Sequence, residues 1–192
     1  MTSTELLQEA SKITEENITF LNSQILPLSE EQKNWKKDQN SWSLNEIFAH
    51  LNEYAAYYHK AMQRKIETTR FRTPRENFVS SPLGRSAWKS MKLGNLQNVK
   101  RKMKSPRNYN PVHHPELVKG DDSERFEKEQ HDLLQIIKSA ATINIRKAKI
   151  PISISKIIRL RFGDALLFIV YHNERHVRQA LNLIQHPKFP KI

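Results

Sequence analysis

The sequence predicts an all-α protein, a helix bundle, from three observations. Four segments of bundle length carry apolar residues at helical spacing, at about residues 4–25, 43–61, 121–141 and 163–185. Capping residues open the first three segments, and proline follows the first and the last. One long connection, residues 67–120, is interrupted by five prolines and lacks sustained periodicity. Amphipathic helices of this length bury their apolar faces against one another, which favours a bundle.

The first two helices have local start signals. Thr4 is the expected N-cap of the first helix, with Glu5 in its first turn, and Pro27 ends it. A short helical turn is expected at residues 29–32. The second helix begins with a capping box, Ser43 followed three residues later by Glu46. Its apolar stripe then contains Leu44, Ile47, His50, Leu51, Tyr54, Tyr57, Tyr58 and Ala61.

The last two helices are expected after the long connection. The cluster Asp121-Asp122-Ser123 indicates the start of the third helix, because acidic groups favour the positive end of the helix dipole. Residues 150–154 predict one short extended piece. The fourth helix covers about 163–185 and is closed by Pro187. Within the connection, short helical turns are expected at 86–91 and 96–103.

Composition limits the classes of protein. With 192 residues, we expect one domain, 1–192, carrying an insertion at about 67–120. The absence of cysteine excludes disulfides, cysteine-ligated zinc and a protein thiol nucleophile. No phosphate-binding glycine motif is present. There is no signal-peptide pattern and no apolar stretch of membrane-spanning length, so we expect a soluble, cytoplasmic protein without a membrane partner.

Positive charge is concentrated in one part of the chain. The net charge is +12, and residues 64–107 contain 13 Lys and Arg against two Glu, a segment charge of +11. Such a segment can bind nucleic acid or another anionic partner. It can equally be a solvated basic insertion with no fixed partner, since it has no recognisable nucleic-acid-binding motif.

Two histidines share one face of the fourth helix. His172 and His176 are four residues apart and continue its apolar stripe. Such a pair is either hydrogen-bonded in the core or provides two ligands of one metal ion. An open metal site usually has three protein ligands, and His50, which faces the core from the second helix, can be the third. His59 lies off that stripe, and the adjacent His113 and His114 are expected in a surface loop.

Three motifs resemble those of the DinB-like (DinB/YfiT) superfamily and follow the same order along almost the whole chain. The first is Trp35, ahead of the second helix. The second is the run from Trp42-Ser43 through Glu46 to His50-Leu51, similar to the family's Trp-Ser…Glu…His-Leu pattern. The third is Phe162-Gly163-Asp164 followed by His172, His176 and Gln179, similar to its His-x3-His-x2-Gln ending. The middle segment matches only loosely.

The resemblance implies an antiparallel four-helix bundle with a long crossover between its second and third helices. It also implies a divalent metal, zinc or nickel, on His50, His172 and His176 at one end of the bundle. Characterised members include thiol-dependent transferases and isomerases that use a low-molecular-weight thiol; others are assigned only as hydrolases. Members often form homodimers through helix faces.

Other polar groups near these motifs have two interpretations each. Glu46 and Gln179 are spaced to support the metal ligands, although Glu46 also fits its capping role and Gln179 can be an ordinary helix-edge residue. Arg175 and Arg178 can bind an anionic substrate or thiol, or simply face solvent. No residue is identified as a general base.

Two functional hypotheses follow. The first is a metal-dependent enzyme, a hydrolase or thiol-dependent transferase acting on a small molecule. A chain without cysteine would have to take its thiol from a cofactor, which fits the transferase type. The alternative is a non-catalytic, stress-associated binding module that uses the basic segment 64–107, with nucleic acid among its candidate partners. A weaker third possibility is an inert relative whose histidines only bond one another.

Overall fold

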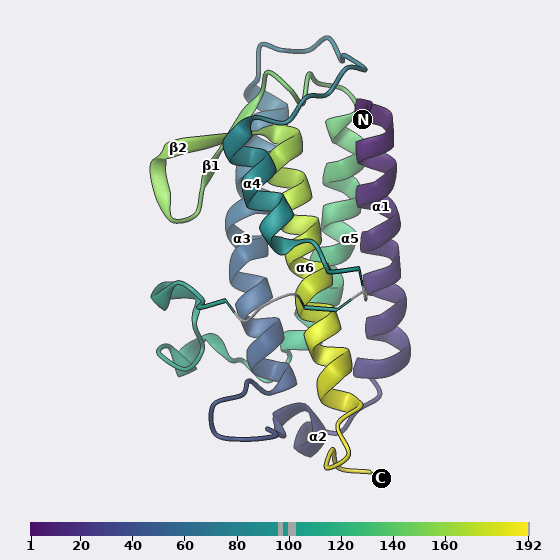
Figure 1. Ribbon diagram of the computed structural model, residues 1–192, viewed down its shortest axis with the longest axis vertical. Coiled ribbons are helices and arrows are strands. Elements are labelled where there is room, and N and C mark those ends of the chain that lie inside the picture. Colours follow the sequence, from purple (N-terminus) through teal and green to yellow (C-terminus); the bar gives the residue numbers. More distant parts are fainter. Residues whose placement is uncertain (96–97, 100–102, 192) are drawn as a thin grey trace.

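The computed structural model describes residues 1–95, 98–99 and 103–191, apart from the side chain of Lys156, and this part is mostly helical. Four long helices lie side by side (Figure 1): α1 (Ser3–Phe20), α3 (Leu44–Thr68), α5 (Asp122–Ala140) and α6 (Phe162–Ile184). α3 packs against α5 and α6, and α1 also packs against α5 and α6. The all-α prediction is therefore correct in its coarse form.

The N-terminal helix starts two residues earlier than the predicted cap. Thr2, not Thr4, is the N-cap: its hydroxyl accepts the N–H of Glu5 at 3.0 Å, and the Glu5 carboxylate accepts the N–H of Thr2 at 2.7 Å. Glu5 therefore closes a capping box that the shorter prediction missed. Beyond Phe20 the chain continues as a π-helical turn, Leu21–Ile25, so the predicted end at residue 25 agrees with the structure.

Local signals at the next two helices are confirmed. The short helix α2 (Glu30–Asn34) is capped by Ser29 and Gln32, and α3 begins at the predicted box of Ser43 and Glu46. α5 begins at the predicted cluster, but by a different contact. Asp121 makes no side-chain cap; instead the carboxylate of Asp122 accepts the backbone N–H groups of Lys119 and Gly120 at 2.8 and 3.1 Å.

The expected single extended piece at 150–154 is instead a two-stranded antiparallel hairpin. Strand β1 (Lys149–Ile152) pairs with β2 (Ser155–Arg161), which leads directly into α6. The second strand was missed because its apolar and basic residues do not alternate regularly. The structure therefore adds a small sheet to the predicted helices, and the hairpin projects from the side of the molecule in Figure 1.

The long connection contains a further helix. α4 (Pro82–Met91) includes the predicted turn at 86–91 but is longer, because Ser81 caps it and Pro82 suits its first turn. It packs along α6. Two 3-10 turns follow, η2 (Arg107–Tyr109) and η3 (Pro115–Leu117). Most of the turn predicted at 96–103 lies outside the described residues.

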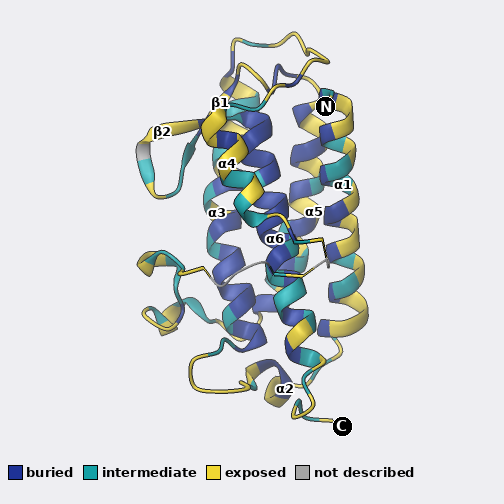
Figure 2. Ribbon diagram, in the orientation of Figure 1, coloured by how far each residue is buried: buried dark blue, intermediate teal, exposed yellow. Residues whose placement is uncertain are grey.

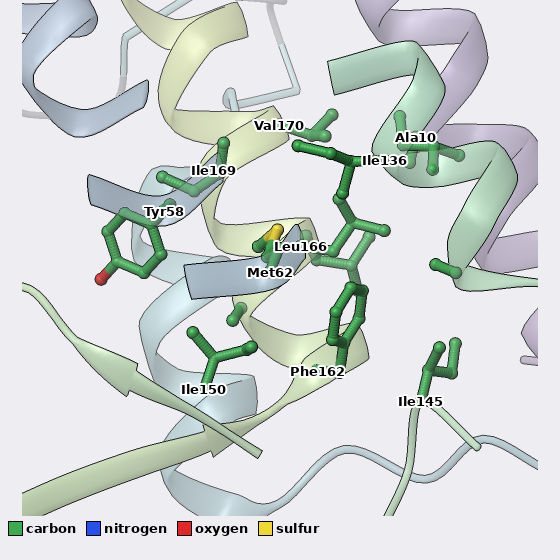
Figure 3. Close-up of a cluster of buried hydrophobic side chains, with 14 of the residues drawn as sticks. Ala10, Tyr58, Met62, Ile136, Ile145, Ile150, Phe162, Leu166, Ile169 and Val170 are labelled. Carbon is green, nitrogen blue, oxygen red and sulfur yellow. The ribbon is translucent and has the colours of Figure 1, made fainter. Parts of the chain in front are cut away.

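Burial follows the inward faces of the long helices (Figure 2) and forms two apolar clusters. Figure 3 shows part of the larger one, with side chains from α1, α3, α5, β1 and α6. The smaller cluster lies around the π-helical turn, the start of α3 and the end of α6. Between the two clusters lie buried polar side chains, including His50, His172 and the pair Asn17 and Gln130. No helix in the described residues is long and apolar enough to cross a membrane.

Candidate metal centre

Three histidines from two helices meet in the polar layer between the apolar clusters. His50 comes from α3, and His172 and His176 come from successive turns of α6. One ring nitrogen from each lies within 4.8 Å of the others, and the Nε2 atoms of His50 and His172 are 3.3 Å apart. The packing of α3 on α6 therefore brings together the three residues selected from the sequence. They lie between two apolar clusters rather than at an end of the helices.

The crossover between α3 and α5 orients the ring of His50. Its Nδ1 lies 2.6 Å from the backbone carbonyl oxygen of Tyr109, at the end of η2. A carbonyl can only accept, so Nδ1 carries the proton and Nε2 of the neutral ring carries the lone pair. That lone pair faces His172. The crossover thus holds His50 in the tautomer that a metal ligand requires.

The two rings on α6 differ in their support. Nδ1 of His176 lies 3.1 Å from Oε1 of Gln179, one turn later, which leaves Nε2 of His176 with its lone pair. Nδ1 of His172 is buried and has no hydrogen-bond partner in the described part of the chain. Nε2 of the same ring faces Nε2 of His50 at 3.3 Å, so Nε2 rather than Nδ1 is placed to bind a metal ion.

Burial keeps all three rings uncharged. It lowers the pKa of His50 from 6.5 to about 4, against an opposing effect of the bond to Tyr109. The pKa values of His172 and His176 are also well below 6.5, first because of burial and then because of the neighbouring histidines and Arg175. Neutral imidazole is the form that binds a metal ion, so the group is ready for one at neutral pH.

Aromatic side chains form the walls of the site. The ring of Trp42 lies 5.0 Å from that of His50 and stacks at 6.1 Å on His176. Tyr54 lies 4.4 Å from His172 and 4.7 Å from Tyr109, and Phe168 stacks on His172 at 5.8 Å. Trp42 belongs to a motif recognised in the sequence and Tyr54 to the apolar stripe of the second helix, but neither was selected as a site residue. The signal for Tyr54 was its position one turn after His50.

Glu46 and Gln179 have different positions relative to the histidines. Both carboxylate oxygens of Glu46 are engaged: one accepts the N–H of Ser43 at 2.9 Å, and the other pairs with Lys36 at 2.6 Å. This favours the capping role. Gln179 touches His176 directly, as the motif spacing suggested. Arg175 is buried, so the interpretation that it simply faces solvent is wrong, and Arg178 is half-buried.

The remaining histidines of the sequence analysis stand apart from the cluster. His113 is exposed, and Nδ1 of His114 pairs with Glu116 at 2.8 Å. His59 is buried and joins α3 to α5 through Glu129 at 2.8 Å. These contacts are those of a surface loop and of an interhelical polar pair.

The basic segment 64–107 partly lies against the helices. The guanidinium of Arg72 donates to the carbonyls of Ile66 and Glu67 at the end of α3. Lys92 donates to Glu9 and to the hydroxyl of Tyr171 at 3.3 and 3.1 Å. Residues 96–97 and 100–102 of this segment lie outside the described residues. Binding of nucleic acid by the segment stays a prediction, as does the homodimer.

Comparison with known proteins identifies the family. A sequence model of the DinB superfamily matches residues 13–180, which include all three histidines. The chain belongs to the DinB superfamily. This superfamily is generally metal-binding, and the cluster of His50, His172 and His176 can hold a metal ion. No curated protein and no solved structure shows significant similarity to this DinB-superfamily chain.

The residues of this DinB-superfamily chain fit a divalent metal. Two rings have Nδ1 held by an oxygen acceptor, the third faces His50 through Nε2, and all three are neutral. Three imidazoles and an open position are typical of a catalytic rather than a structural zinc site. Imidazole also suits nickel, copper and iron, so the donor set selects no single metal.

Proposed function

We propose that the protein is a metal-dependent enzyme acting on a small molecule, either a hydrolase or a thiol-dependent transferase. His50, His172 and His176 would hold a divalent ion, zinc or nickel. The observation that carries the proposal is the convergence of three neutral imidazoles, two of them fixed through Nδ1. We also propose that α1, α3, α5 and α6 form an antiparallel four-helix bundle, with the crossover that carries Tyr109 lying between α3 and α5.

The chemistry of the proposed site follows from its ligands. Three neutral ligands leave the ion its full charge, so that it can lower the pKa of a bound water or thiol. The aromatic walls of Trp42, Tyr54 and Phe168 limit the access of bulk water and suit a substrate with an apolar part. Because the chain has no cysteine, the transferase reaction requires a separate low-molecular-weight thiol.

Metal binding is the first test. Protein purified without an affinity tag or chelator is expected to contain about one divalent ion per chain. His50→Ala and His172→Ala are expected to remove it, whereas His131→Ala should not, because His131 lies exposed on α5 and pairs with Glu127. Elemental analysis beside thermal unfolding separates loss of metal from loss of folding. Full occupancy in folded His172→Ala would contradict the proposal.

The two reaction types can be separated with the metal-loaded protein. A hydrolase is expected to cleave small ester or amide substrates without added thiol. A thiol transferase is expected to consume thiol and an electrophile together in equal amounts. Either activity should disappear in His172→Ala. Metal-loaded protein that accelerates neither reaction would remove the support for an enzyme and favour the binding-module hypothesis.

Gln179 provides a finer test of the same site. Gln179→Ala removes the acceptor that holds Nδ1 of His176, and loss of such a supporting contact typically weakens metal affinity by about 10- to 100-fold. Competition titration against a chromophoric chelator measures the change. Gln185→Ala, at the exposed end of α6, is the control. Equal affinities for the two variants would show that Gln179 does not position His176.

A further inference from the structure

The hairpin of β1 and β2 carries apolar side chains outside the protein. Ile154, Ile157 and Ile158 are 68%, 91% and 43% exposed, and they lie within five consecutive residues. Large aliphatic side chains gathered on a projection, rather than scattered singly, mark a surface that contacts something else. This position lies outside the histidine site and its walls.

The part of the hairpin next to the helices is anchored, which keeps the isoleucines at its tip away from the protein. Ile150 and Leu160 pair across the strands and are both buried against the helices. The hydroxyl of Tyr57 donates to the carbonyl of Ile152 at 3.1 Å, and that of Tyr58 accepts the N–H of Ser153 at 3.3 Å. The tip therefore cannot fold back on the protein without breaking these contacts.

The strands that carry the isoleucines are basic. Residues 149–161 contain no Asp or Glu and four basic residues: Lys149, Lys156, Arg159 and Arg161. Lys149 and Arg161 are direct partners across the strands, and like charges in such a pair destabilise a sheet. Alternation along the regularly paired part of β2 places Arg159 and Arg161 on one face. An external anionic partner would relieve this repulsion.

We propose that this hairpin docks the protein on an anionic lipid surface. The isoleucines enter the boundary between headgroups and acyl chains, and Lys149 and Arg159 contact the lipid phosphates. A second copy of the chain fits less well, since it would bring two basic hairpins together. Nucleic acid would use the cations but not the isoleucines. The contact is peripheral, and it revises the expectation of no membrane partner without requiring a spanning helix.

Co-sedimentation with vesicles tests the proposal. The full chain is expected to bind vesicles of phosphatidylcholine mixed with phosphatidylserine, and this binding should weaken as the salt concentration is raised. It should bind vesicles of phosphatidylcholine alone weakly or not at all. Ile157→Ser is expected to weaken vesicle binding at least about tenfold, since it removes most of the aliphatic group that the lipid would bury. Arg159→Gln should weaken it about fivefold.

Matched variants elsewhere on the surface separate docking from general charge. Val112→Ser removes an apolar side chain that is 57% exposed on the crossover, and Lys128→Gln removes an exposed cation on α5. Both are expected to bind the mixed vesicles as the unaltered protein does. No vesicle binding, or equal binding by Ile157→Ser, overturns the proposal. So does lipid-free self-association that Ile157→Ser abolishes, which would assign the tip to a second copy.

Discussion

The metal-free protein is expected to lose about 3 kcal/mol of its free energy of unfolding through His50 alone as pH falls from 6.5 to about 4. The pKa of His50 is lower in the folded protein than in the unfolded chain, chiefly because the ring is buried. Between these pH values the unfolded chain binds more protons. Stability that is fully present above pH 6.5 is therefore lost as pH falls, and His172 and His176 act in the same direction.

Denaturant unfolding in the presence of a chelator, repeated over this pH range, measures the effect. His50→Gln replaces the titrating ring with a neutral group, so its profile is expected to be flatter by up to about 1.4 kcal/mol per pH unit. His131→Gln is the control, because His131 is exposed. If the free energy of unfolding changes with pH equally in the unaltered protein and in His50→Gln, protonation of His50 is not coupled to unfolding.

Gly84→Ala is expected to destabilise the protein by about 2–4 kcal/mol, although alanine favours a helix over glycine by about 1 kcal/mol. Gly84 lies in α4 where this helix crosses α6. A Cβ there would lie 2.1 Å from Oδ2 of Asp164, and 2.2 and 2.5 Å from its Cγ and Cβ. Asp164 is fully buried, and its Oδ2 accepts both the N–H and the hydroxyl of Ser81 at 3.0 Å, so it cannot move away cheaply.

A double-mutant cycle tests this contact. Asp164→Gly removes all three atoms that the new Cβ would meet, at the cost of the bonds to Ser81, so Gly84→Ala should cost less in that background. Ser86→Ala, at an exposed position of the same helix, is expected to be neutral or slightly stabilising. Equilibrium unfolding of each variant measures these differences in the free energy of unfolding. A Gly84→Ala protein as stable as the Ser86→Ala protein would mean that α4 does not approach α6 this closely.

Interactions between neighbours in the sequence could be predicted. The box of Ser43 and Glu46 joins residues three apart, and the spacing of His172 and His176 places both on one helix face whatever packs against it. The same local rules predicted the end of the first helix near residue 25. The box of Thr2 and Glu5 has the same spacing but was missed, because Ser3 and Thr4 are also capping residue types ahead of this helix. The local rules also missed β2, whose pairing with β1 depends on cross-strand contacts.

The sequence by itself determined the mostly helical fold, the DinB-superfamily membership and the three histidines as candidates, since each depends on local periodicity or on motif order. Only the tertiary structure decided that His50 meets His172, that Tyr109 orients His50, and that Gly84 packs on Asp164. The physical reason is that these contacts join distant segments through backbone atoms and helix crossings. A backbone carbonyl oxygen is present at every residue, so no residue type marks the one that accepts the hydrogen bond from Nδ1 of His50.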